Sequence, residues 1–105
     1  MNVSMGEDLR ELYDTGRSNK YKEVSRNKVL KAGFSRAVMA MQKAGSVEDL
    51  KRLSFLHYEQ LKYEYSGYSS VRLSNSYVHR LIFLEHEDGI ELELIEIDDT
   101  HYGNR

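Results

Sequence analysis

The sequence predicts an α+β protein, with a small antiparallel sheet and the N-terminal helices packed on one face of it. Two observations predict this fold class. Apolar residues recur with a helical period from the N-terminus to about Leu53. Beyond Leu53, Tyr, Val and Ile become frequent and apolar residues alternate with polar ones, which is typical of strands. A run of helices followed by a run of strands is the pattern of α+β domains.

Two short helices are predicted from capping-box spacings. Ser4 stands three residues before Glu7, which predicts a helix start at this point, and Gly16 is expected to end that helix. Ser46 and Asp49 repeat the same spacing and predict another helix start further along the chain.

A long helix is predicted between them, over about residues 24–44. Its apolar stripe has helical spacing and consists of Leu30, Phe34, Ala37, Val38 and Met41. Gly33 lies inside this helix, where glycine costs about 1 kcal/mol relative to alanine. We therefore expect a close packing contact or a bend at Gly33.

Three strands are predicted in the second half, over residues 68–73, over residues 77–85 and from Ile90 onward. In the third strand, apolar residues alternate with glutamates.

The last two strands should form a hairpin, because Asp88-Gly89 is a typical two-residue turn. This turn would pair Phe83 with Leu94 and Ile82 with Ile95. Apolar pairs would then occupy both faces of the hairpin. The helices can cover only one face, so a partner or the chain's own tail should cover part of the other.

Length and composition limit the class of protein. A chain of 105 residues suffices for one core, so we expect a single domain over residues 1–105. With 40% apolar and 30% charged residues, the chain has the composition of a folded soluble protein. The longest apolar runs, residues 37–41 and 81–84, are too short to span a membrane, and the N-terminus has no signal-peptide pattern. We expect a cytoplasmic protein.

No metal site or cofactor site is predicted. The sequence has no cysteine, which excludes disulfides, thiolate metal ligands and cysteine nucleophiles. His79 and His86 fit no metal-ligand spacing with His57 or His101. No phosphate-cradling glycine loop is present either.

Charge is distributed unevenly along the chain, although the net charge is only −2. Residues 17–47 contain eight Lys or Arg and one acid, whereas residues 85–99 contain eight acids and no Lys or Arg. This asymmetry is typical either of two solvated faces or of local fields that steer a charged partner. Lys28 and Lys31, in the basic stretch, are candidate RNA contacts.

The second half also carries a family resemblance, in the order of the segments LHYEQLK, SVR, RLIF and IEIDDTHYG. This order is similar to the HigB-like branch of the RelE/ParE toxin superfamily, from bacterial type II toxin-antitoxin systems. The resemblance implies a RelE/ParE-like fold with a weak first strand around residues 2–4. It also implies a ribosome-dependent mRNA endoribonuclease that inhibits translation, needs no metal and is silenced by a helix-turn-helix antitoxin (HigA-like). Its partners would be that antitoxin, the ribosome and mRNA, with DNA reached only through the antitoxin.

Two arginines are candidates for the chemistry. Metal-free cleavage of RNA needs a base for the ribose 2′-hydroxyl, cations for the charge on phosphorus and an acid for the departing 5′-oxygen. Arg72 and Arg80 lie on neighbouring predicted strands, and the guanidinium fork suits phosphate. We assign Arg72 to catalysis and Arg80 to RNA binding. The alternative for each is a structural ion pair across the sheet, with Glu91, Glu93 or Glu96.

The C-terminal segment supplies titratable candidates. His101 changes charge near neutral pH and can act as an acid or a base. The resemblance implies functional roles for both Asp99 and His101. Asp99 would orient His101. Thr100 stands where the family more often has an aromatic residue, and Tyr102 can supply that ring for RNA binding. The alternative is that His101 is an ordinary solvated histidine.

The segment LHYEQLK contains His57, Glu59 and Lys62. The resemblance implies that Lys62 contacts phosphate and that His57 is a second acid or base. A surface lysine and a buried histidine are the alternatives. Tyr63 replaces the glycine that usually follows this lysine in the family. Tyrosines suited either to stacking on RNA bases or to strands cluster nearby: Tyr58, Tyr63, Tyr65, Tyr68 and Tyr77.

Three functions stay open at this stage. The first is the mRNA endoribonuclease. The second is a ParE-like or catalytically degenerate relative that acts by binding a protein, for example gyrase, and the acidic strands and Thr100 favour it. The third is an antitoxin-binding or structural module without toxicity.

Overall fold

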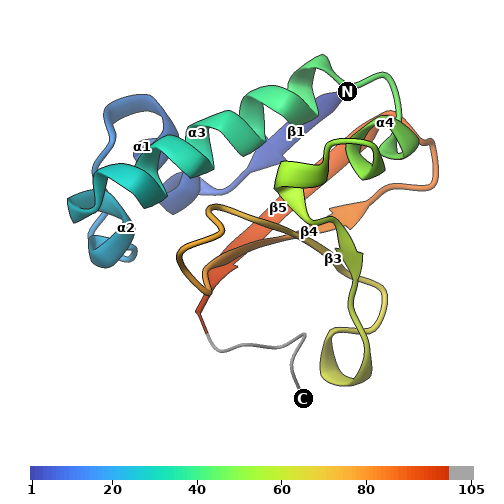
Figure 1. Cartoon of the computed structure of the whole chain (residues 1–105). Coiled ribbons are helices and arrows are strands. Elements are labelled where there is room, and N and C mark those ends of the chain that lie inside the picture. The colour runs from blue at the N-terminus through green and yellow to red at the C-terminus, as the bar shows by residue number, and fades with distance from the viewer. Residues whose placement is uncertain (100–105) are drawn as a thin grey trace.

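In the described part of the chain, four helices and five strands form two layers, with the helices on one face of a single sheet (Figure 1). The computed structural model describes residues 1–99, with Glu64 described through its backbone only. The helices are α1 (Glu7–Thr15), α2 (Lys22–Arg26), α3 (Lys28–Lys43) and α4 (Val47–Lys51). The strands are β1 (Asn2–Met5), β2 (Glu59–Gln60), β3 (Ser69–Arg72), β4 (Arg80–Glu85) and β5 (Glu91–Asp98), with short 3-10 turns η1 (Ser54–Leu56) and η2 (Tyr63–Tyr65). The predicted α+β class is confirmed.

The sheet has the order β1-β5-β4-β3-β2. The pairs from β2 to β5 are antiparallel, as predicted, whereas β1 adds a parallel pair to β5. This first strand is the one that the family resemblance implies. Ser4 therefore pairs within β1 and caps no helix, so the capping-box prediction is wrong there; the N-cap of α1 is Gly6.

The predicted long helix is interrupted at Asn27. The Asn27 side chain accepts hydrogen bonds from the backbone N–H groups of Val29 and Leu30, at 3.0 and 3.1 Å. This N-cap starts α3 afresh and leaves α2 as a separate short helix. The predicted stripe of α3 is confirmed, because all five of its apolar side chains are buried.

Gly33 marks the closest approach between α3 and the sheet. An ideal Cβ built on Gly33 would lie 1.9 Å from the carbonyl oxygen of Leu73, just beyond β3. No side chain fits at that distance. The predicted close packing at Gly33 is therefore present, and the hydrogen atom of glycine lets the helix lie directly on the strand end.

The register of the β4–β5 hairpin is confirmed in part. Phe83 pairs with Leu94, as predicted, but Ile82 pairs with Glu96 because a β-bulge at this point inserts Ile95 as an extra residue. The predicted Ile82–Ile95 pair is therefore wrong. The bulge leaves Glu96 on the face that the helices do not cover.

The turn of this hairpin is wider than the predicted two-residue type. The N–H of His86 donates to the carbonyl of Glu91 at 3.1 Å and closes a four-residue loop. The Asp88 side chain accepts from the N–H groups of Ile90 and Glu91, and Gly89 adopts φ 74°. Asp88 and Gly89 therefore stabilise the turn as predicted, but the turn is a four-residue loop.

In the part of the chain that the structure describes, no helix is both long and apolar enough to cross a membrane.

Candidate functional site

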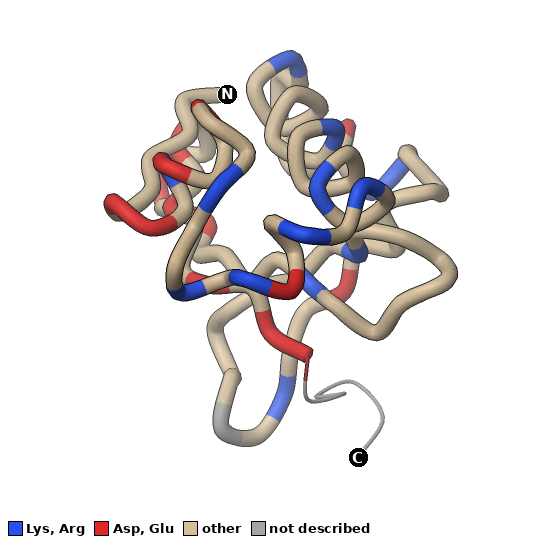
Figure 2. The backbone as a smooth tube through the Cα atoms, turned by 90° about the vertical axis from the view of Figure 1, so that its left-hand side faces the viewer, with Lys and Arg blue, Asp and Glu red and all other residues tan. Residues whose placement is uncertain are grey.

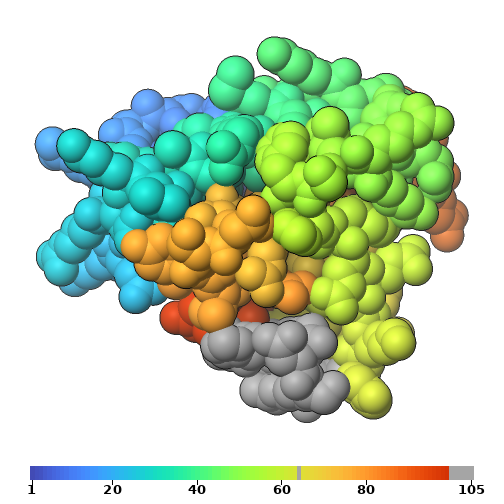
Figure 3. All heavy atoms as spheres, in the orientation of Figure 1, coloured from blue at the N-terminus to red at the C-terminus, as the bar shows by residue number. Residues whose placement is uncertain are grey.

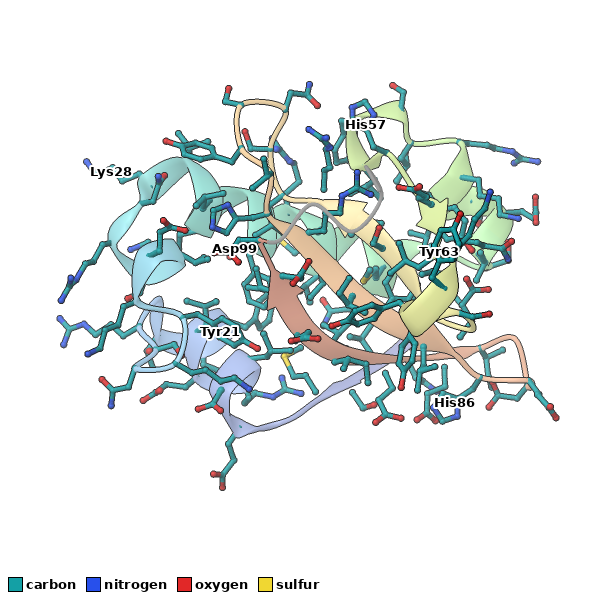
Figure 4. All side chains as sticks on the ribbon, turned by 90° about the horizontal axis from the view of Figure 1, so that it is seen from below. Tyr21, Lys28, His57, Tyr63, His86 and Asp99 are labelled. Carbon is teal, nitrogen blue, oxygen red and sulfur yellow. The ribbon has the colours of Figure 1, made fainter. Side chains whose placement is uncertain are left out.

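The face of the sheet opposite the helices is the candidate site. Leu81 and Phe83 of β4 belong to the core cluster under the helices, so Arg80 and Ile82 point to the opposite face. The register places a group of polar residues on that same side, which we call the open face: Glu59, Ser70, Arg72, Arg80, Glu96 and Asp98. Figure 4 views the molecule from this side.

Arg80 is the buried cation of the open face, with 7% exposure. Its guanidinium forms an ion pair with the carboxylate of Glu59 on β2, and its Nη1 donates to the Ser70 hydroxyl at 3.3 Å. The partner is therefore Glu59 and not one of the β5 glutamates considered from the sequence. The Glu59 side chain is 41% exposed, so solvent or a ligand reaches its carboxylate.

Arg72 lies directly opposite Arg80 in the β3–β4 register and is half-buried. Among the side chains that the structure describes, which leave out Glu64, no carboxylate forms a salt bridge with Arg72. Like charges directly opposite each other destabilise a sheet. An anion between the two guanidinium groups would relieve this repulsion, and phosphate fits their forked geometry. The structure thus brings the two predicted arginines together.

His57 and Lys62 lie on the β2 side of this face. His57 is exposed, with φ 48°, and its Nε2 lies 2.8 Å from the side-chain oxygen of Asn75 in the β3–β4 loop. The buried-histidine alternative is therefore wrong. Lys62 is exposed two residues after β2. Its role as a phosphate contact stays a prediction.

Tyr58 lies next to His57 but on the helix side of the sheet, where its ring packs 6.2 Å from that of Phe83. Burial and a hydrogen bond to the Glu85 carboxylate raise the pKa of the Tyr58 hydroxyl to about 12. The hydroxyl therefore keeps its proton at neutral pH. Tyr58 anchors β2 to β4 and is no candidate for the base.

Asp99 is exposed directly after β5. Figure 4 shows it at the end of β5, nearer to Tyr21 than to His57 or Tyr63. His101 and Tyr102 lie outside the described residues, and their assigned roles stay predictions.

The basic stretch surrounds a polar hollow of about 490 Å³ between the α1–α2 loop and α3. Its lining includes four cations and no acid: Arg17, Lys22, Arg26 and Lys31. Lys28 is exposed on the first residue of α3. Figure 2 looks onto this end of the molecule, where Lys and Arg segments run along α2, the loop before it and α3. This surface has the charge that an RNA backbone requires.

A second hollow, of about 610 Å³ and mostly apolar, lies between α3 and the segment that contains α4 and η1. Met39 and Phe55 line it and are exposed, at 47% and 39%. Arg36, Lys43 and Asp49 also line it, and the Arg36 guanidinium lies 5.3 Å from the centre of the Phe55 ring. Figure 3 shows α3 and this segment in contact on one face of the molecule.

Glu59 is the site residue whose role the sequence did not reveal. It belongs to the LHYEQLK segment, but β2 is only two residues long and gives little strand signal. Its partnership with Arg80 follows from the order β2-β3-β4, which brings β2 and Arg80 within side-chain reach across β3.

No known family model matches the sequence, and no curated protein does. Solved structures do share its fold, including the following two. One is the YoeB-YefM complex from Staphylococcus aureus, with a TM-score of 0.57, 19% identity, and 93% of this chain and 94% of that chain covered. The other is the YoeB/ParE toxin from Agrobacterium tumefaciens, with a TM-score of 0.54, 19% identity, and 95% and 99% covered.

The chain has the fold of these toxins. The RelE/ParE-like fold expected from the resemblance is confirmed. Both structural neighbours carry the name YoeB, whereas the resemblance pointed to the HigB-like branch.

Tyr63 stands where the resemblance leads us to expect a glycine. Tyr63 adopts φ 60°, a left-handed conformation that glycine reaches without strain, and its side chain is 80% exposed. The ring contributes little to the core at this position. An exposed ring on a strained backbone is suited to contact with a ligand such as an RNA base.

We expect Tyr63→Gly to keep stability within about 1 kcal/mol of the parent, because backbone strain is relieved while chain entropy is lost. RNA affinity should fall about tenfold, since stacking on one base contributes about 1–3 kcal/mol. Urea unfolding and filter binding measure the two effects. Tyr63→Trp is the matched control, because it restores a ring and should restore affinity. Equal RNA affinity for Gly and Trp at this position would exclude stacking.

Proposed function

We propose that this chain is the toxin of a type II toxin-antitoxin system, a HigB-like member of the RelE/ParE superfamily that cleaves mRNA on the ribosome and so inhibits translation. The observation that carries the proposal is the grouping of Glu59, Arg80 and Arg72 on the open face. The fold neighbours support a toxin of this superfamily. The HigB-like assignment rests on the order of the sequence segments.

The open face offers a base and two cations for RNA cleavage. A phosphate held between Arg72 and Arg80 would compete with Glu59 for Arg80 and leave the Glu59 carboxylate free to act as a base. The base removes the proton of the ribose 2′-hydroxyl, and the 2′-oxygen attacks phosphorus. The bond to the 5′-oxygen breaks, which leaves a 2′,3′-cyclic phosphate. The two guanidinium groups stabilise the extra negative charge that develops on the phosphoryl oxygens.

The acid that protonates the departing 5′-oxygen is assigned to His101, with Asp99 to orient it and Tyr102 to stack on a base. His57 is the second candidate for this acid, because it is exposed at the β2 end of the same region. Lys62 would contact a neighbouring phosphate. No step needs a metal or a cofactor.

A protein partner is also part of the proposal. One of the solved structures that share the fold is a complex of YoeB with YefM. We propose that this chain likewise binds a cognate antitoxin, HigA-like and of the helix-turn-helix kind. The apolar hollow beside α3, with Met39 and Phe55 exposed, is a candidate surface for it.

The second candidate function is a ParE-like protein-binding toxin that leaves RNA intact and acts on a target such as gyrase. The observation that favours it is the Glu59–Arg80 ion pair, which by itself is a satisfied structural contact. Inducing the chain alone in bacteria separates the two functions. We expect growth and translation to stop within minutes and new mRNA ends to appear inside coding regions. DNA breaks and an SOS response with unchanged mRNA ends would support the ParE-like function instead.

Binding to ribosomes should depend on salt through the basic surface. We expect the double variant Lys28→Glu/Lys31→Glu to weaken ribosome binding and to lower the slope of log affinity against log salt by about one to two units, because two phosphate contacts are lost. Sedimentation with ribosomes at several salt concentrations measures the slope. Lys51→Glu/Arg52→Glu, at the exposed end of α4, is the control for net charge, because it changes the charge by the same amount away from the basic surface. An unchanged slope in the double variant would show that this surface is only a solvated helix face.

A further inference from the structure

Three side chains from distant parts of the chain meet where α2, the β3–β4 loop and the end of β5 come together. Glu23 belongs to α2, His79 is the last residue before β4, and Asp99 directly follows β5. One potential ligand atom from each residue lies within 4.8 Å of the other two. Glu23 and His79 are 56 residues apart in sequence, so the cluster is a product of the fold.

His79 is the buried member of this cluster, with 7% exposure. Its Nε2 faces the Glu23 carboxylate, whereas its Nδ1 is buried and has no hydrogen-bond partner among the described residues. A buried polar atom without a partner pays its desolvation penalty uncompensated. Packing therefore holds the His79 ring in a position where the described residues satisfy Nε2 but leave Nδ1 without a hydrogen bond.

The charges of the cluster are also unbalanced. Two carboxylates approach one imidazole, and no Lys or Arg within residues 1–99 forms a salt bridge with Glu23 or Asp99. Two anions at this separation repel each other. A divalent cation between them would turn this repulsion into attraction.

We propose that Glu23, His79 and Asp99 form a binding site for a zinc ion. One imidazole nitrogen with two carboxylate oxygens is a donor set that suits Zn²⁺, whereas Mg²⁺ and Ca²⁺ prefer oxygen ligands alone. Some point lies within about 2.8 Å of all three ligand atoms, and zinc bonds of about 2.0–2.2 Å need only small movements from there. Glu23 and Asp99 are both exposed, so they can make these movements and leave an entry path.

The ion would join α2 to the point where β5 ends. Three protein ligands leave at least one coordination position for water. Asp99 has a part in both proposals, but the zinc site is argued from the geometry of the cluster, and its test measures binding and stability and not cleavage. The spacing of the histidines along the sequence does not predict this site, because two of its three ligands are carboxylates. These carboxylates lie on elements that only the fold brings close to His79.

The test is zinc binding by the chelator-treated full chain. Titration calorimetry should show one Zn²⁺ per chain, with no comparable binding of Mg²⁺. A zinc concentration 100 times the dissociation constant should raise the melting temperature by about 10 °C. Glu23→Gln and Asp99→Asn, both at exposed positions that should not affect folding, should each weaken zinc binding at least tenfold and reduce the thermal shift.

The matched control is Glu93→Gln. Glu93 lies 3.3 Å from His86 and Glu91 lies 3.9 Å from it, so this exposed cluster also joins two carboxylates to one imidazole but has no buried histidine. The control variant should bind zinc as the parent does. Absence of zinc binding, unchanged binding in both Glu23→Gln and Asp99→Asn, or loss of binding in Glu93→Gln would each overturn the proposal.

Discussion

Replacing Gly33 with alanine should destabilise the protein by about 3 kcal/mol or more, a large part of the stability of a domain of this size. The added Cβ would lie 1.9 Å from the Leu73 carbonyl oxygen, which is backbone and cannot rotate away. Either α3 moves off the sheet, which opens the core around Phe34, or the end of β3 shifts and takes Arg72 with it. The free energy of unfolding from urea denaturation measures the loss.

Gly6→Ala is the control for this substitution, because an ideal Cβ on Gly6 meets no atom within 4 Å. It should change stability by less than about 1 kcal/mol. A similarly small effect for Gly33→Ala would show that α3 and the sheet separate easily, and would contradict the close contact between Gly33 and Leu73.

Replacing Arg72 with alanine should lower mRNA cleavage by about 100-fold or more, because one of the two charges that stabilise the phosphoryl group is lost. Stability should hold or rise slightly, since the like-charged neighbour of Arg80 is removed. Cleavage per folded molecule and the melting temperature are measured together. The control is Arg52→Ala, which removes an exposed arginine from the end of α4.

A drop of several degrees in melting temperature with cleavage retained would show that Arg72 is structural. Arg80→Ala is less informative than Arg72→Ala. It leaves Glu59 without its partner in a half-buried position, so lost folding and lost chemistry would be hard to separate.

Much of the fold could be predicted because its signals are local. The stripe of α3, the strands of the second half and the Phe83–Leu94 pair follow from the periodicity of apolar residues. The errors have local causes as well. Asn27 ends one helix and caps the next inside a continuous helical pattern, and the extra residue Ile95 shifts the register after a correct start.

The site was predictable only in part, because its contacts join distant segments. Arg72 and Arg80 were expected on neighbouring strands and do lie opposite each other. Glu59 comes from a two-residue strand, and its contact with Arg80 depends on the sheet order. The meeting of Glu23 with His79 likewise depends on where α2 packs. Periodicity and spacing along the sequence carry no information about contacts of this kind.

The central claim is that the open face cleaves mRNA on the ribosome, and a reconstituted translation system tests it most directly. Purified chain is added to ribosomes that translate a defined mRNA, and the new 5′ ends are mapped for the parent, Arg72→Ala and Glu59→Gln. We predict cuts inside the coding region that require translation, and their loss in both variants while the variants still fold. Intact mRNA with the parent chain, or equal cleavage by all three proteins, would contradict the claim.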